Sequence, residues 1–297
     1  MQEHIRVPHF PSRFWWAPEE RGDAPVALPA SALLMTPAPA AFERLGDSPS
    51  SDDDERREPR QPVTALAGPL VAHVAVLQLF ALERGHRLWG FNALALGRYR
   101  WRREPGLVFS KSLGSGFEGG FGVRPSGSRQ GLFCVFEDEA AADRFLASSR
   151  FLAAYRARAL EHVSLKLRVC SSRGSWSGRA LAPATPPPAA GPVASLTRAS
   201  IRPASAMRFW RKAPPAERAL ETAPGCMLAV GLGEAPLLRQ ATFSVWESAA
   251  AMDAYARSGA HLEAIRAAYR ERYFSESMFV RFVPGELRGV WKGRRLG

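Results

Sequence analysis

One histidine stands out as the residue best suited to redox or metal chemistry. His261 is the only histidine in the C-terminal third of the chain, and it falls in a segment whose apolar residues recur with a helical period. Its neighbours on the same side of that helix are mostly small, namely Ala254, Ser258, Ile265 and Ala268. Small side chains beside an imidazole leave room for a flat ligand, so His261 is the candidate functional centre. The alternative is a half-buried histidine that only hydrogen-bonds to a backbone carbonyl.

Polar residues in otherwise apolar strand segments are further candidates. Arg198, Gln240 and Ser244 could each donate a hydrogen bond to a ligand bound near His261, or could instead face solvent or a loop. Cys226 is the rival metal ligand, as a thiolate, although no basic helix end accompanies it. The chain shows no pair of catalytic carboxylates, no Ser-His-Asp order and no Cys/His metal cluster.

The segments around these residues predict the elements that must position them. An apolar run at 227–230 leads into a Gly-Leu-Gly turn, and a second strand-like run covers 241–246. A helix of about six turns then carries His261, and a strand at 278–282 closes the unit.

The same order of elements occurs earlier in the chain. Residues 136–152 align with residues 246–262 at a constant offset of 110, and the Pro105-Gly106 pair matches Pro224-Gly225. This pattern indicates an internal duplication. At the position of His261 the first copy has Phe151, and larger or charged residues replace the small neighbours. The first copy therefore fills the space that small side chains leave open beside His261 in the second copy.

Each copy reads β-α-β-β-α-β, the pattern of the ferredoxin-like fold. Such a sheet carries helices on one face and leaves the other face to be covered. The predicted fold is therefore α+β, with two duplicated ferredoxin-like units packed sheet to sheet as an α/β barrel of the dimeric α/β-barrel type within one chain.

Composition divides the chain into four segments. Residues 1–65 are rich in proline and include the run SPSSDDDERREPR, which predicts a disordered extension. The first repeat covers 69–178, a Pro-rich linker covers 179–191, and the second repeat, with the His261 site, covers 192–297. Three cysteines without paired spacing favour a reducing compartment, hence the cytoplasm.

The net charge, a basic aromatic segment and a glycine-rich run each support a functional prediction. The formal charge of +12 favours an acidic partner surface, either anionic lipid or nucleic acid. The segment 84–103 interleaves arginine with aromatic residues, which fits a peripheral membrane helix, a nucleic-acid surface or simply a core helix with a basic face. The run GSGFEGGFG opens no helix, so we interpret it as a hairpin connection that could cover a substrate entrance and not as a phosphate loop.

Several of these motifs together resemble the spheroidene monooxygenase family. They are FSKSLGSGFEGGF, VASLTRASI, MRFW, VGLGEAP, RQATFSVWE, AMDAYARSGAHLEAIRAAYRERYFSE and FVRF. The resemblance covers about residues 69–293, and His261 falls at the family's matching histidine. It implies an oxygen-dependent enzyme that introduces keto or hydroxy groups into a lipid-soluble acyclic carotenoid.

The resemblance also implies haem b as cofactor, with its iron bound by His261, O2 as co-substrate and reduced ferredoxin or a similar protein as electron donor. Contact with the periphery of the inner membrane would suit a substrate dissolved in lipid. Two other function classes stay open: a non-redox protein that binds haem or an apolar ligand, and a basic nucleic-acid-binding module.

Overall fold

In the computed structural model the described residues are 73–297, apart from residues 101–103, 123, 236 and 258. They all belong to the compact unit Thr64–Gly297. The extension predicted at residues 1–65 lies outside the described residues.

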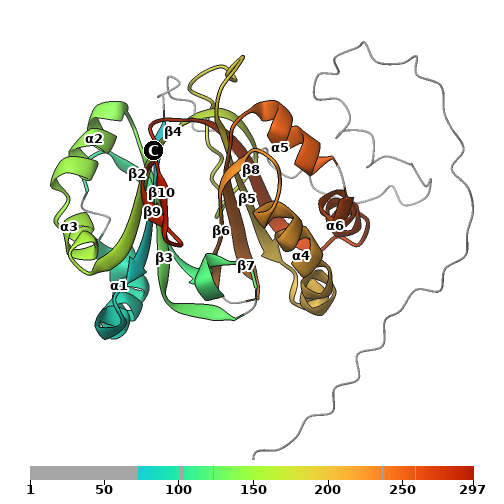
Figure 1. Ribbon diagram of the computed structural model, residues 1–297, viewed down its shortest axis with the longest axis horizontal. Helices are drawn as coiled ribbons and strands as arrows, with labels where there is room; N and C mark the ends of the chain where they lie inside the picture. Colours follow the sequence, from blue (N-terminus) through green and yellow to red (C-terminus); the bar gives the residue numbers. More distant parts are fainter. Residues whose placement is uncertain (1–72, 101–103, 123, 236, 258) are drawn as a thin grey trace, which may run out of the picture. The chain divides into compact units, whose positions relative to one another are not determined.

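The strands and helices of the two halves follow one another in the same order (Figure 1). The first half contains β1 (Val74–Leu82), α1 (Arg87–Arg100), β2 (Leu107–Gly116), β3 (Pro125–Phe136), α2 (Glu139–Ser148), α3 (Arg150–Arg156) and β4 (Ala159–Gly174). The second contains β5 (Val193–Ile201), α4 (Ala206–Glu221), β6 (Cys226–Ala235), β7 (Arg239–Trp246), α5 (Ala249–Ala256), α6 (Gly259–Arg270) and β8 (Phe274–Pro284). Two short strands, β9 (Arg288–Trp291) and β10 (Arg294–Leu296), end the chain.

The strands form one antiparallel sheet that closes into a barrel. Their order is β1-β3-β2-β6-β7-β5-β8-β4-β9-β10, and β1 also pairs with β4. Within the halves the orders β4-β1-β3-β2 and β8-β5-β7-β6 correspond. The halves join at two seams: β4 pairs with β8 over much of its length, whereas β2 and β6 share the pairs Gly114–Gly233 and Ser115–Leu232. The prediction of an α+β fold is confirmed.

Alternation along the strands divides the apolar side chains between the barrel interior and its outer surface. On β1, Leu77 and Leu79 belong to the interior core, whereas Val76 and Phe80 belong to a cluster shared with the helices of the first half. The interior core draws residues from both halves and is closed by Trp176, Leu181 and Trp291. Leu181 comes from the predicted linker, which therefore packs against the barrel.

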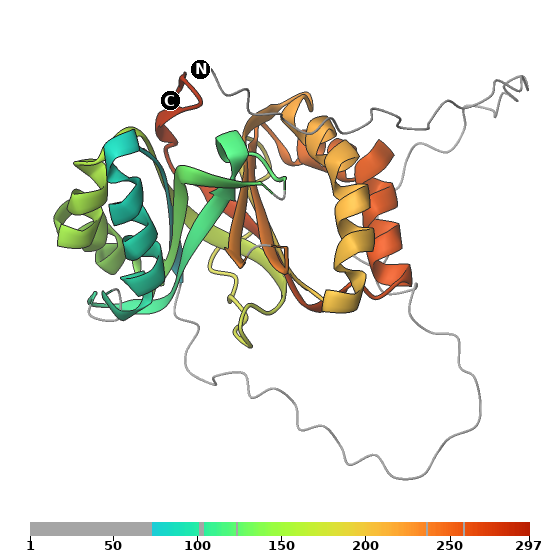
Figure 2. The ribbon, with the colours of Figure 1, turned by 90° about the horizontal axis from the view of Figure 1, so that it is seen from below.

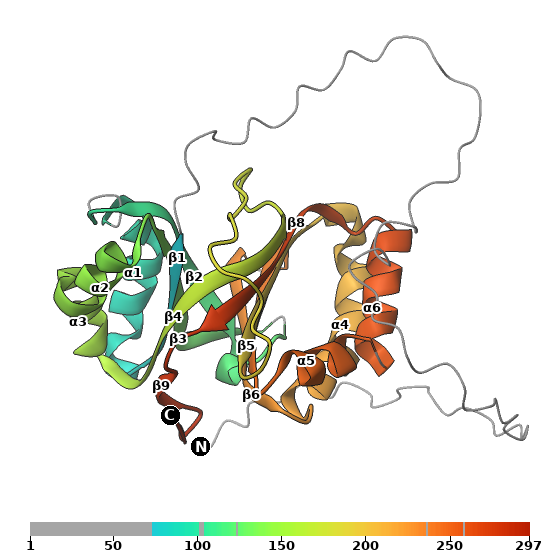
Figure 3. The ribbon, with the colours of Figure 1, turned by 90° about the horizontal axis from the view of Figure 1, so that it is seen from above.

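The helices lie outside the barrel in two groups. Helices α1, α2 and α3 lie on one side of the strands and α4, α5 and α6 on the other (Figures 1 and 2). In both views α4 and α6 run side by side, and Figure 3 shows the same pair from the opposite direction. Each half therefore presents its outer sheet face to its own helices.

Two local predictions differ from the structure. The long helix predicted around His261 is two helices, α5 and α6, because the chain turns between them and Gly259 has a φ of +53°. The predicted Gly231-Leu232-Gly233 turn lies inside strand β6, where extended glycines allow close approach of another segment.

Candidate active site

His261 lies in the first turn of α6 beside Tyr255, which lies in the last turn of α5. The Tyr255 hydroxyl and His261 Nδ1 are 3.2 Å apart, and the ring centroids are 4.6 Å apart. A residue six positions earlier would not share a face with His261 on one continuous helix. The break between α5 and α6 is what brings the two side chains together.

The environment keeps the His261 imidazole neutral. Burial lowers the pKa of His261 from 6.5 to about 4. A neutral imidazole has one nitrogen lone pair, and metal-binding histidines usually hold their other nitrogen by a hydrogen bond. In the tautomer whose Nδ1 donates its proton to the Tyr255 hydroxyl oxygen, Nε2, which has no hydrogen bond among the described residues, is the nitrogen available to a ligand.

A chain of contacts links His261 to the sheet. The Tyr255 ring packs on the Trp246 ring with centroids 5.3 Å apart, and Trp246 Nε1 donates a hydrogen bond of 2.9 Å to Ser244 Oγ. Trp246 and Ser244 both face outward from β7, because they are two residues apart on one strand. This chain of contacts connects His261 to Ser244, two of the sequence candidates, through Tyr255 and Trp246.

The outer sheet face of the second half carries smaller side chains than that of the first. Corresponding pairs, matched by strand register, are Val76 and Ser195, Gln78 and Thr197, Phe80 and Ala199, Leu132 and Thr242, and Cys134 and Ser244. All five positions are buried in the first half, with at most 1% exposed. In the second half Ser195, Thr197 and Thr242 stay partly exposed, although they lie on central strands.

Apolar packing shows the same difference. In the first half one cluster joins the outer sheet face to α1, α2 and α3. In the second half two separate clusters occur: one around Trp246 and Met252, and another around Phe209 and Tyr273. Among the described side chains, helices α4 to α6 thus contact the sheet near its two ends, and Ser195, Thr197 and Thr242 on the sheet face between the clusters are partly exposed.

The glycine-rich segment of the first half reaches this face. A Cβ on Gly231 would lie 2.4 Å from the Gly120 oxygen and 2.7 Å from the Phe121 Cα, so the segment runs directly against β6. Ser115 Oγ donates a hydrogen bond of 2.6 Å to the Gly231 oxygen, and Phe121 packs on the cluster that contains Trp246 and Tyr255. Sequence reasoning missed this contact and missed Tyr255 and Trp246 as partners of His261; the glycine inside an apolar strand was the one available signal.

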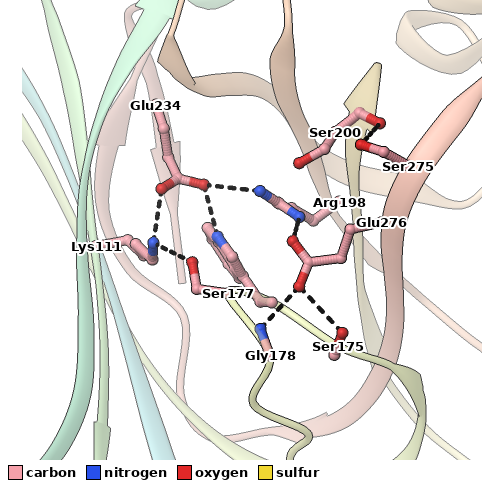
Figure 4. A network of polar contacts seen from close by, with 10 residues as sticks. Lys111, Ser175, Ser177, Gly178, Arg198, Ser200, Glu234, Ser275 and Glu276 are labelled. Carbon is pink, nitrogen blue, oxygen red and sulfur yellow. Dashed lines mark hydrogen bonds and ion pairs between the residues drawn. The ribbon is translucent and has the colours of Figure 1, made fainter. Parts of the chain in front are cut away.

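Arg198 lies on the opposite face of the sheet, inside the end of the barrel. It is 2% exposed, pairs closely with Glu276 and donates a 3.3 Å hydrogen bond to Glu234 (Figure 4). Glu234 also accepts hydrogen bonds from Lys111 Nζ and Trp176 Nε1, both at 2.6 Å. Burial acts to raise the pKa of Glu234, but these hydrogen bonds and the charges of Lys111 and Arg198 hold it below its ordinary value. The structure does not bring Arg198 to the face that carries His261.

The other two candidates lie at the edges of that face. Gln240 faces outward on β7, like Ser244, but near the β6–β7 turn, where its side-chain amide lies against Gly233. Cys226 begins β6; its Sγ donates to the Leu228 oxygen at 3.6 Å, and burial raises the pKa of its thiol to about 11. At neutral pH that thiol carries its proton.

Metal-ligand groups and membrane-spanning helices are the next two features to consider. Within residues 73–297, the gaps aside, no three His, Cys, Asp or Glu side chains gather as a metal-binding group. No described helix is both long and apolar enough to cross a membrane.

Three curated proteins named spheroidene monooxygenase are similar to the chain. The protein from Rubrivivax gelatinosus is 58% identical over 224 residues, which cover 75% of this chain and 87% of that protein. The protein from Rhodobacter capsulatus is 35% identical over 228 residues, covering 74% and 94%, and the one from Cereibacter sphaeroides is 31% identical over 211 residues, covering 70% and 65%. No family model matches the chain.

Solved structures show weaker similarity. An aldoxime dehydratase (OxdRE) has 10% identity and a TM-score of 0.49, covering 73% of this chain and 81% of its own. A putative monooxygenase from Lactobacillus acidophilus NCFM has 14% identity and a TM-score of 0.33, covering 76% and 99%.

Proposed function

Because the chain belongs to the spheroidene monooxygenase family, we propose that it is a monooxygenase that introduces keto or hydroxy groups into an acyclic carotenoid, with haem b bound through His261. One atom of O2 enters a C–H bond of the substrate and the other leaves as water. Two electrons and two protons balance this hydroxylation, and a reduced ferredoxin or similar donor protein supplies the electrons. A keto group needs a second such hydroxylation at the same carbon, followed by loss of water from the resulting diol.

The difference between the two outer sheet faces is the observation that supports this proposal. The first half fills the space between sheet and helices with Val76, Phe80 and Leu132. The second half has serine, alanine and threonine at these positions, and its described side chains form two separate apolar clusters. A chain that needed only a packed core would gain by filling this space, since underpacked apolar regions cost stability.

The residues present fit a haem. Nε2 of His261 is a neutral donor of the kind that binds haem iron, and Tyr255 holds the other ring nitrogen. The facing strands offer small side chains, at Ser195, Thr197 and Thr242, beside which a flat macrocycle could lie. When bound, the haem supplies the oxygen activation that ordinary side chains cannot perform.

The chain's own residues orient and enclose the reactants. Ser244 Oγ already accepts a hydrogen bond from Trp246, so its own proton is free to be donated toward the face that it shares with Thr242. We propose that Ser244, and secondarily Gln240, is the hydrogen-bond donor beside the reactants. Arg198 stabilises the barrel end instead, because it points to the other side of the sheet.

We further propose that the two halves are duplicated ferredoxin-like units. Their corresponding strand orders and the shared β-α-β-β-α-β sequence of elements support this. After duplication one copy would have kept a packed outer face while the other kept the ligand site. Superposing the two halves as rigid bodies tests the idea, and a mismatch of their strand registers would contradict it.

The haem proposal is tested by the haem-to-protein ratio and Soret position of purified variants. His261→Ala should fold and lose most of its haem, and added imidazole should partly restore the spectrum, since removal of the ring leaves a space that free imidazole can enter. His162→Ala is the matched control, because His162 is also a buried neutral histidine but hydrogen-bonds to Gln78 in the first half. The control should keep its haem.

A histidine at the equivalent position of the first half tests whether only the second half can hold a haem. Phe151→His should create no second haem site, because Phe151 packs on Tyr155 within the filled cluster of the first half. Full haem content in His261→Ala would move the ligand to another residue, with Cys226 the next candidate. A wild-type protein that never binds haem would remove the cofactor proposal.

Turnover tests the substrate proposal separately. The protein, O2 and a reduced donor should add oxygen to spheroidene-like or lycopene-like carotenoids, seen as a mass gain from labelled O2. Haem binding without any turnover would favour a non-redox haem or apolar-ligand binding protein.

A further inference from the structure

One corner of the second half combines exposed apolar side chains with a concentration of arginines. Met207, at the start of α4, is 79% exposed, and Leu237, in the β6–β7 turn, is 45% exposed. Exposed arginines lie on the segments 202–211, 237–239 and 270–272. We call Met207, Leu237 and these arginines together the arginine corner. The arginines are Arg202, Arg208, Arg211, Arg239, Arg270 and Arg272.

Hydrogen bonds show that these three segments meet. Trp210 Nε1, on α4, donates to the Leu237 oxygen at 2.9 Å, which ties α4 to the β6–β7 turn. The Arg202 backbone nitrogen donates to the Tyr273 oxygen at 2.8 Å, which ties the start of α4 to the segment after α6. The Ile201 nitrogen donates to the Leu238 oxygen at 2.7 Å. The arginine corner is therefore one surface and not a set of scattered residues.

The corner has a rigid base. Phe209 packs beneath it on Tyr273 and Phe274, with ring centroids 6.4 and 5.9 Å apart. Ala267 and Ala268 of α6 complete this cluster. Because this base is packed, the segments that carry the exposed side chains are already ordered before any partner binds.

Charge at the corner is almost all positive. The segments 202–211, 237–239 and 270–272 contain one acidic residue, Glu271, which pairs with Arg208 and Arg270, each at 3.7 Å. The nearby carboxylates of Glu234 and Glu276 are held by Lys111 and Arg198 inside the barrel end. The remaining arginines face solvent without compensation by an acid on these segments.

We propose that the arginine corner docks the protein on an anionic lipid bilayer. Apolar side chains ringed by guanidinium groups match the membrane interface, where the former enter the acyl boundary and the latter contact phosphate. Nucleic acid fits less well, since single strands need exposed aromatic rings for stacking and Trp210 is tied to the β6–β7 turn. The corner lies at the start of α4 and the end of α6, whereas His261 lies in the first turn of α6.

The test measures binding of the full chain to vesicles that contain neither carotenoid nor haem, so its outcome is independent of the proposed activity. Vesicles of phosphatidylcholine with phosphatidylglycerol are compared with phosphatidylcholine alone by co-sedimentation. Wild type should bind the anionic vesicles, and salt should weaken that binding because it screens exposed charges.

Charge-matched triple variants locate the surface. Arg211→Gln, Arg239→Gln and Arg272→Gln together should lower the partition coefficient roughly hundredfold, at about fivefold for each arginine. The control replaces three exposed arginines of the first half, Arg144, Arg150 and Arg168, by glutamine. An equal loss in the control would show that net charge alone drives binding and would overturn the proposal.

Two variants of exposed apolar residues test whether the membrane contact lies at the arginine corner or on α1. Met207→Ser should weaken vesicle binding, and Leu88→Ser, which changes a side chain 82% exposed on α1, should not. The reverse result would place the membrane contact on α1. Absence of binding to either vesicle, or stronger competition from single-stranded DNA than from lipid, would also overturn the proposal.

Discussion

The hydroxyl of Tyr255 lies 3.2 Å from Nδ1 of His261, and the Tyr255 ring separates His261 from Trp246. Tyr255 therefore touches both the candidate ligand and the sheet. Its hydroxyl can set the tautomer of His261, while its ring sets the direction of the imidazole.

The variant Tyr255→Phe separates these two contributions. It keeps the ring and removes the hydroxyl, so we expect a folded protein whose haem affinity is about tenfold weaker, with a shifted Soret band. The matched control is Tyr155→Phe, which removes a buried hydroxyl that donates to Gln130 at 2.9 Å in the first half. If both variants change haem binding alike, Tyr255 acts through general stability only.

Stability should depend on pH through two half-buried histidines, His261 and His162. The pKa values of His261 and His162 are lowered by burial from 6.5 to about 4. The unfolded chain then binds protons before the folded one, so stability is full above pH 6.5 and falls as the pH drops toward 4. His261→Gln should show a smaller fall over this window, measured by urea unfolding at several pH values. An unchanged fall would mean that the imidazole titrates normally in the folded protein.

The variant Arg198→Met should destabilise the barrel end. The Arg198 side chain is 3% exposed, and its removal leaves Glu234 and Glu276 without their shared cation. Breaking a buried ion pair from one side costs about 3–5 kcal/mol of unfolding free energy. Arg281→Met is the control, because Arg281 forms an exposed pair with Asp253 and should cost about 0–1 kcal/mol. Similar losses in the two variants would show that the Arg198 cluster is solvated.

Glycine at position 231 should be required for the contact between the halves. In Gly231→Ala the new methyl group would collide with the backbone of Gly120 and Phe121, so we expect lower thermal stability and greater proteolysis of the glycine-rich segment. In Gly114→Ala the nearest atom to the new Cβ would be 3.9 Å away, an ordinary contact. A Gly231→Ala protein as stable and as resistant as Gly114→Ala would show that the segment moves aside freely.

Residue pattern alone determined much of this protein. The strand-like runs predicted at 241–246 and 278–282 lie within β7 and β8, and the offset of 110 residues that pairs Phe151 with His261 follows from sequence. The family resemblance is confirmed by the relatives at 58% and 35% identity. These features are local or repeated, so periodicity and motif spacing are enough to reveal them.

Tertiary structure alone decided which candidates share a face. Arg198 and Ser244 look alike in sequence, as polar residues within apolar strands, but strand register turns one into the barrel and the other outward. Tyr255 reaches His261 only because the helix breaks, and Phe121 reaches their cluster only because β2 pairs with β6. Such contacts join residues far apart in the chain, and their geometry depends on how the whole sheet closes, which no local pattern encodes.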